Sequence, residues 1–165
     1  MLTYPISRVS NFPKLLEEVN SIIQLAGFQK NQIICQSLDS DIDNWHVGIG
    51  SLEELEESEE KRYCNIHSKL KNSVLAELIQ QHNGFRTRIM LMPPRQCYSI
   101  HADPTPRLHI PIVTNDQCWM IWPHKQTCNQ LQTNLVHWTD TRKLHTFVNG
   151  GLENRIHIVM CVDPK

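Results

Sequence analysis

The chain contains 165 residues, with 16 Lys and Arg against 17 Asp and Glu, a formal net charge of −1, and 40% hydrophobic residues. This length suits one compact unit, and we expect residues 1–165 to form a single domain. The balanced charge argues against a broad basic surface that binds nucleic acid, and no apolar run is long enough to span a membrane.

The six cysteines are widely spread along the chain and include no C-x-x-C pair. Structural zinc sites usually draw their ligands in close pairs, so the spacing argues against one. Residues 1–8 lack the basic and apolar regions of a secretory signal. We therefore expect free thiols and a cytoplasmic protein.

The first 84 residues are expected to be mainly helical and to support the rest of the chain. Asn11 and Pro13 are typical of a helix start. Apolar residues then recur at helical spacing as far as Ala26, and Gly27 is expected to end this helix.

Three further features precede residue 85. Residues 31–36 predict a short strand. Residues 53–60 hold six glutamates among eight residues, which could bind a cation but are expected to form a solvated helix face. Apolar residues from Leu70 to Ile79, at helical spacing, predict a second long helix over residues 63–81.

After Gly84 the pattern changes to short apolar or alternating segments separated by Pro, Asn and Gly. Such segments predict strands in an antiparallel sandwich or jelly roll. Helices followed by strands indicate an α+β chain, mainly β in its core, with the helices packed on a sheet face. The predicted strands are residues 85–92, 107–114, 118–122, 135–138, 146–148 and 155–162.

Polar residues inside the strand-rich half are the candidates for chemistry. His101 and Asp103 are two residues apart, so on an extended segment both side chains point the same way and could hold one metal ion. His145, ahead of a glycine turn, is the best candidate for a third ligand. The alternatives are a buried hydrogen-bonded trio or a zinc or nickel site of the cupin type.

Arg155 opens an apolar strand, where a guanidinium is costly to bury unless it meets an anion. A sheet-edge salt bridge is the alternative, and His157 shares its side of the strand. Arg107 and His109 repeat this arrangement on another strand. For those two, an ion pair with a carboxylate competes with a role in ligand binding.

Together these residues resemble the aspartyl/asparaginyl β-hydroxylase family of Fe(II)- and 2-oxoglutarate-dependent oxygenases. The resemblance extends over residues 85–163 and rests on an ordered set of short motifs. These are His101-x-Asp103, Arg107-x-His109-Ile-Pro, Val113-Thr-Asn115, Asp140-Thr, His145-Thr and Arg155-Ile-His-Ile-Val.

The resemblance implies a double-stranded β-helix, a cupin-like jelly roll with flanking N-terminal helices. Arg155 would hold the distal carboxylate of 2-oxoglutarate, and Arg107 and His109 match positions that assist co-substrate binding in some relatives. Tyr98 matches a position that places a hydroxyl on the co-substrate in several such enzymes. The residues that would bind Fe(II) are His101, Asp103 and His145.

The implied activity is an Fe(II)/2-oxoglutarate-dependent dioxygenase that uses O₂ to hydroxylate an amino-acid side chain. The substrate would be an Asp- or Asn-type residue in a polypeptide, or a free amino acid. A non-catalytic metal-binding jelly-roll module that senses a 2-oxo acid or docks a partner is the alternative. The charge balance disfavours a nucleobase substrate.

Overall fold

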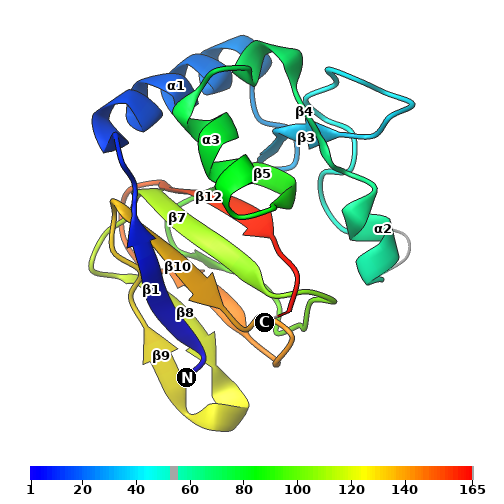
Figure 1. The fold of residues 1–165 in the computed structure, drawn as a ribbon. Coiled ribbons are helices and arrows are strands. Elements are labelled where there is room, and N and C mark those ends of the chain that lie inside the picture. The colour runs from blue at the N-terminus through cyan, green and yellow to red at the C-terminus, as the bar shows by residue number, and fades with distance from the viewer. Residues whose placement is uncertain (53–55, 165) are drawn as a thin grey trace.

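The computed structural model describes residues 1–52 and 56–164, and two antiparallel β-sheets form its centre (Figure 1). Neighbouring strands of the larger sheet are all antiparallel. In spatial order this sheet contains β1 (Thr3–Arg8), β10 (Leu135–Thr139), β7 (Arg107–Val113), β12 (Arg155–Cys161), β5 (Phe85–Met92) and β2 (Gln32–Ile34).

A smaller, four-stranded sheet lies against the inner face of the larger one. Phe147 in the smaller sheet packs against His109 and His157 of the larger sheet, with ring centroids 6.1 and 5.3 Å apart. This two-sheet arrangement confirms the predicted jelly roll. The strands, in spatial order, are β6 (Gln96–Cys97), β11 (Thr146–Asn149), β8 (Cys118–Trp122) and β9 (Thr127–Asn129), and a short 3₁₀ turn, η2 (Pro123–Lys125), joins the last two.

Two helices, α1 (Phe12–Ala26) and α3 (Val74–Gln81), cover the outer face of the larger sheet (Figure 1). Their apolar stripes and the outward residues of the sheet form one buried core, which is the largest apolar cluster in the described chain. Burial of this surface is the main free-energy gain that holds the helices on the sheet. The central members are Leu15, Val19, Ile22, Leu75, Ile79, Ile89, Leu108, Ile110, Ile158 and Met160.

The first helix was predicted correctly from its termini. The Asn11 side chain accepts a hydrogen bond from the Lys14 backbone N–H, which satisfies one of the free donors of the first turn. Gly27 follows the helix at φ +67°, a backbone conformation that favours glycine.

The predicted helix over residues 63–81 is wrong in its first half. Strand β4 (Asn65–Ile66) pairs there with β3 (Gln36–Ser37), and a 3₁₀ turn, η1 (Ser68–Leu70), follows. Asn72 then adopts φ +64°, which a continuous helix does not allow.

Helix α3 begins only at Val74, where two side chains satisfy its first N–H groups. The Ser73 hydroxyl accepts from the Ala76 N–H at 3.0 Å. The Glu18 carboxylate of α1 accepts from the N–H groups of Val74 and Leu75 at 3.0 and 3.2 Å. A contact with another helix therefore sets this start, which local apolar spacing does not reveal.

The acidic run at residues 53–60 departs from the predicted solvated helix face at Glu60. Residues 53–55 lie outside the described part of the chain, and α2 (Glu57–Lys61) contains the rest of the run. Glu57 pairs with Lys61 on the surface, but Glu60 is only 1% exposed and points into the protein. The expectation is therefore wrong for Glu60, because its cationic partners come from distant strands.

The six strands predicted after Gly84 are confirmed to within one residue at each end as β5, β7, β8, β10, β11 and β12. The predicted strand at residues 31–36 is divided between β2 and β3. The first 84 residues also contribute β1, which the sequence analysis missed. Strand β1 is an edge strand of its sheet and so tolerates Pro5.

All six cysteines are free thiols, as expected. Within the described residues, no helix combines the length and apolar character that crossing a membrane requires.

Candidate functional site

The inner face of the larger sheet is polar because side chains alternate along each strand. Leu108 and Ile110 of β7 point outward to the helical core, so Arg107 and His109 point inward. With the smaller sheet, this face encloses a cavity of about 340 Å³. Its polar lining includes Arg86, Arg88, Tyr98, His101, Asp103, Arg107, His109, His145 and Arg155.

The three predicted metal ligands lie together at this cavity. His101 and His145 form an antiparallel bridge, in which each backbone N–H donates to the other residue's carbonyl at 3.0 and 2.9 Å. The Asp103 N–H donates to the Thr141 carbonyl, which continues the pairing. One ligand atom from each of the three side chains lies within 4.8 Å of the other two.

Backbone carbonyls orient both histidine rings. His101 Nδ1 lies 2.7 Å from the Ser99 carbonyl oxygen, and His145 Nδ1 lies 2.9 Å from that of Lys143. A carbonyl oxygen can only accept a hydrogen bond, so each Nδ1 carries the proton. Each Nε2 is therefore left with the lone pair that a metal requires.

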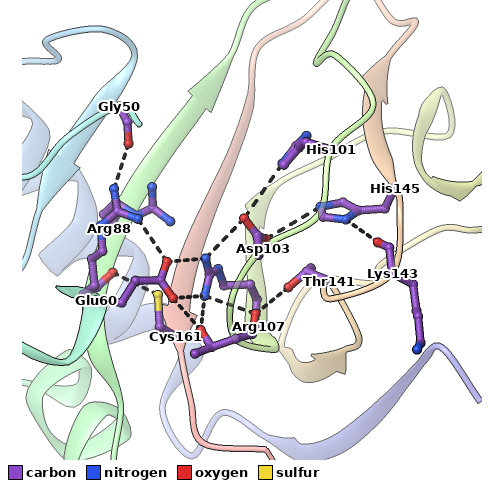
Figure 2. A network of polar contacts seen from close by, with 12 residues as sticks. Gly50, Glu60, Arg88, His101, Asp103, Arg107, Thr141, Lys143, His145 and Cys161 are labelled. Atoms are coloured by element: carbon purple, nitrogen blue, oxygen red, sulfur yellow. Dashed lines mark hydrogen bonds and ion pairs between the residues drawn. The ribbon is translucent and has the colours of Figure 1, made fainter. Parts of the chain in front are cut away.

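Asp103 completes the donor set between the two rings and Arg107 (Figure 2). Its carboxylate oxygens lie 4.0 Å from His101 Nε2 and 3.7 Å from His145 Nε2. Both distances exceed a hydrogen bond, which argues against a trio held by mutual hydrogen bonds. Two imidazoles and one carboxylate on one side of a site are the ligands of non-haem Fe(II) in proteins, so these residues fit that ion.

The charge states also suit a divalent cation. Burial alone would raise the pKa of Asp103, but the positive charges of Arg107 and other neighbours outweigh it, so the pKa lies below its ordinary value. Burial lowers the pKa of His145. The carboxylate is therefore ionised and the imidazole neutral at neutral pH, as metal binding requires.

A buried carboxylate holds Arg107 beside Asp103. The Arg107 guanidinium makes two bonds to Glu60, of 2.5 and 3.0 Å, and a contact of 3.2 Å to Asp103 (Figure 2). Glu60 also accepts from Arg86 at 3.2 Å and from the Thr105 hydroxyl at 2.7 Å. This geometry favours the ion-pair alternative for Arg107 over a direct role in binding a co-substrate.

Arg155 is 1% exposed and forms no ion pair with any carboxylate of the described residues. Its guanidinium lies over the Phe147 ring, 3.4 Å from the centroid, and contacts both ring nitrogens of His157. Burial lowers its pKa to about 9, so the group remains mostly charged at neutral pH. The salt-bridge alternative therefore lacks a partner here, and an anion in the cavity would supply one.

His109 and Tyr98 also line the cavity. Both ring nitrogens of His109 are buried without a hydrogen-bond partner in the described structure, so they are available to a ligand. Tyr98 is half-buried in the segment that leads to His101, and its carbonyl accepts from the Thr146 hydroxyl at 2.6 Å. Their predicted contacts with a co-substrate stay predictions.

The buried histidines of the inner face predict a loss of stability in mild acid. Burial, followed by the charge of Arg155, holds the pKa of His157 well below its ordinary value, and His109 behaves in the same way. Below the unfolded-state pKa of about 6.5, the unfolded chain binds more protons, so the free energy of unfolding falls by up to ~1.4 kcal/mol per pH unit for each such histidine. Urea unfolding at pH 7.5 and 5.5 measures this change.

The His157→Gln variant should show a smaller difference between these two pH values than the wild type. Exposed His124→Gln serves as the matched control and should leave the difference unchanged. If the free energy of unfolding of the His157→Gln variant depends on pH as strongly as that of the wild type, His157 does not contribute to the loss of stability in acid.

The cavity wall also contains polar residues that were not predicted, among them Gln32, Glu60, Arg86 and Arg88. The two arginines carried a usable signal. They alternate within an apolar strand, and the desolvation argument applied to Arg155 applies to them equally. Glu60 carried none, because its partners are 26 and 47 residues away.

Comparisons with known proteins identify the fold. No protein-family model matches the chain, and no curated protein matches its sequence. The viral collagen prolyl hydroxylase vCPH of Paramecium bursaria Chlorella virus-1, solved as a 2OG complex, is similar over 99% of this chain and 97% of its own, with a TM-score of 0.55 and 13% identity. AviO1 from Streptomyces viridochromogenes Tue57 is similar over 99% and 90%, with a TM-score of 0.52 and 14% identity. At these identities the shared property is the fold, a double-stranded β-helix, as predicted.

Proposed function

We propose that this protein is an Fe(II)/2-oxoglutarate-dependent dioxygenase that hydroxylates an amino-acid side chain, of the Asp or Asn type in a polypeptide or as a free amino acid. One observation carries the proposal. A two-histidine, one-carboxylate donor set and a buried arginine that pairs with no carboxylate of the described residues line the same cavity. The motifs of residues 85–163 support the amino-acid substrate.

Each group of the chain has a defined task in this proposal. His101, Asp103 and His145 would hold Fe(II) through one side and leave its other positions open. Fe(II) would supply, with 2-oxoglutarate and O₂, the oxidising power to hydroxylate a C–H bond. Arg155 would bind the distal carboxylate of 2-oxoglutarate, and Phe147 excludes water from one face of that guanidinium.

The acidic helix gives little support to the alternative of a docking module. Glu57 and Glu59 already pair with Lys61 and Arg62, and Glu60 is buried. An anaerobic titration separates the two candidates. Protein loaded with Fe(II) and 2-oxoglutarate should develop a weak visible charge-transfer band. On exposure to oxygen, a catalytic site discharges the band with formation of succinate, whereas a sensing module retains it.

The Arg155→Gln variant should bind 2-oxoglutarate at least about tenfold more weakly, because a charge-assisted hydrogen bond is lost. Its affinity for Mn(II), used as a redox-stable probe, should stay within about threefold of wild type, because Arg155 contacts none of the three ligands. The visible band reports the first affinity and electron paramagnetic resonance of free Mn(II) the second. Exposed Arg95→Gln is the matched control. Equal loss of both affinities would contradict the role of Arg155.

A further inference from the structure

A second buried arginine of the cavity wall is unused by the site described above. Arg88 of β5 is 6% exposed, and its Nε has no hydrogen-bond partner in the described structure. In the described structure its side chain donates one hydrogen bond, to the side-chain oxygen Oε1 of Gln32 at 3.2 Å. Burial, then the charge of Arg86, lowers the pKa of Arg88 to about 10, so the guanidinium stays charged at neutral pH.

The neighbouring arginines are neutralised and Arg88 is not. Glu60 pairs with Arg86 and Arg107, and Asp103 pairs with Arg107. No Asp or Glu of the described chain forms an ion pair with Arg88. A buried guanidinium without an anion is costly, so the position favours a ligand that brings one.

The co-substrate would bring one distal carboxylate to two unpaired arginines whose backbone positions lie apart on neighbouring strands. Arg88 lies opposite Val159 on β12, four residues along the strand from Arg155. Four residues of extended chain separate the two backbone positions by about 13 Å. A 2-oxoglutarate whose distal carboxylate is bound by Arg155, and whose other end is at the metal, leaves Arg88 unneutralised.

Arg88 is held in place from the rim of the cavity. The Gln32 side-chain Oε1 that accepts from Arg88 also accepts from the Gly50 N–H at 3.0 Å. Arg86 donates to the carbonyls of Gly48 and Gly50, which fixes this loop against β5. Gly50 and Ser51 line the cavity beside Arg88. These contacts orient the guanidinium before any ligand arrives, as a preorganised subsite requires.

We infer that Arg88 recognises an anionic group, a carboxylate or a phosphate, on the molecule that this enzyme hydroxylates. The inference rests on the proposed function and narrows its substrate to an acid. The planar guanidinium fork suits both anions through paired hydrogen bonds. Arg88 lines the same cavity as His101, Asp103 and His145, which supports a subsite close to the metal ligands.

The test measures binding of matched probes to protein saturated with Mn(II) and 2-oxoglutarate. N-acetyl-L-aspartate α-amide against N-acetyl-L-asparagine amide tests a carboxylate, and N-acetyl-O-phospho-L-serine amide against N-acetyl-L-serine amide tests a phosphate, so neither comparison probe carries an anionic group. Paramagnetic broadening of the probe's NMR signals reports binding near the metal. We expect at least one acid to bind at least about tenfold more tightly than its neutral partner. The acid that binds more tightly identifies the class of anion.

Three variants decide the role of Arg88. Arg88→Gln should weaken binding of that acid about tenfold or more, and this variant should no longer prefer the acid over the neutral probe. Arg88→Lys should retain part of this preference. Arg95→Gln, which removes the same charge from an exposed turn, should behave as wild type. Retention of the preference by Arg88→Gln, or its absence from the wild type, overturns the inference.

The anaerobic 2-oxoglutarate titration keeps the two hypotheses distinguishable. Arg88→Gln should bind 2-oxoglutarate within about threefold of wild type, because a different arginine holds that carboxylate. If the wild type binds 2-oxoglutarate normally but does not prefer either acid over its neutral probe, only the role of Arg88 is overturned. No 2-oxoglutarate binding by the wild type would overturn the proposed function and this inference with it.

Discussion

The His145→Ala protein is expected to bind Mn(II) or Fe(II) at least about 100-fold more weakly than wild type. This loss of affinity is larger than the loss expected when a residue that only hydrogen-bonds to a metal ligand is removed. His145 is one of only three donors that the described chain brings together, and the remaining pair cannot define one side of a six-coordinate ion. Succinate formation from 2-oxoglutarate should fall below detection. Electron paramagnetic resonance of Mn(II) and mass spectrometry of succinate measure the two effects.

His124→Ala is the matched control, because it removes an imidazole that is exposed and outside the cavity. It should bind metal and turn over as wild type does. The His145→Ala chain should remain folded, because the ring contributes no hydrogen bond to the core beyond the local carbonyl. Undiminished Mn(II) binding by a folded His145→Ala protein would remove this residue from the metal site.

The Glu60→Gln variant is expected to lose about 3–5 kcal/mol of unfolding free energy, the usual cost of removing one charge of a buried ion pair. The loss is large because Arg86 and Arg107 share this carboxylate, and both would remain buried without it. Metal affinity should fall as well, since Arg107 contacts Asp103. Urea unfolding at pH 7.5 measures the first effect and Mn(II) titration the second.

Glu59→Gln provides the control, since its ion pair with Arg62 is partly exposed and exposed pairs are worth about 0–1 kcal/mol. A double variant, Glu60→Gln with Arg107→Gln, should lose less than the sum of the two single changes, by about 0.5–3 kcal/mol. If Glu60→Gln lowers the free energy of unfolding no more than Glu59→Gln does, the buried ion-pair network does not stabilise this part of the fold.

Local periodicity predicted the six strands after Gly84, and local spacing predicted two of the three candidate metal ligands. Strand β5 and helix α1 were found because each carries its own repeat or cap within a few residues. His101 and Asp103 were found because two-residue spacing on an extended segment places them together. His145 was named as a candidate from its place ahead of a glycine turn, and the resemblance to a family gave it the role of third ligand, because 44 residues of sequence separate it from His101.

The failures share one physical cause, which is that the deciding partner is far away in sequence. Val74 begins α3 where a carboxylate of α1 caps it. Glu60 resembles the rest of a solvated acidic run until Arg107, on β7, is placed beside it. Arg88 could have been found from its own strand, but nothing local indicates that Arg86 has an acidic partner among the described residues and Arg88 has none.

The carbonyls that orient the two histidine rings belong to Ser99 and Lys143, each two residues before its ring. Peptide oxygens are present whatever side chain those positions carry. The rotameric state of the ligands is therefore independent of the chemical identity of residues 99 and 143. Evolution, or a protein engineer, can consequently diversify the side chains at these two places while leaving the coordinating nitrogens aligned.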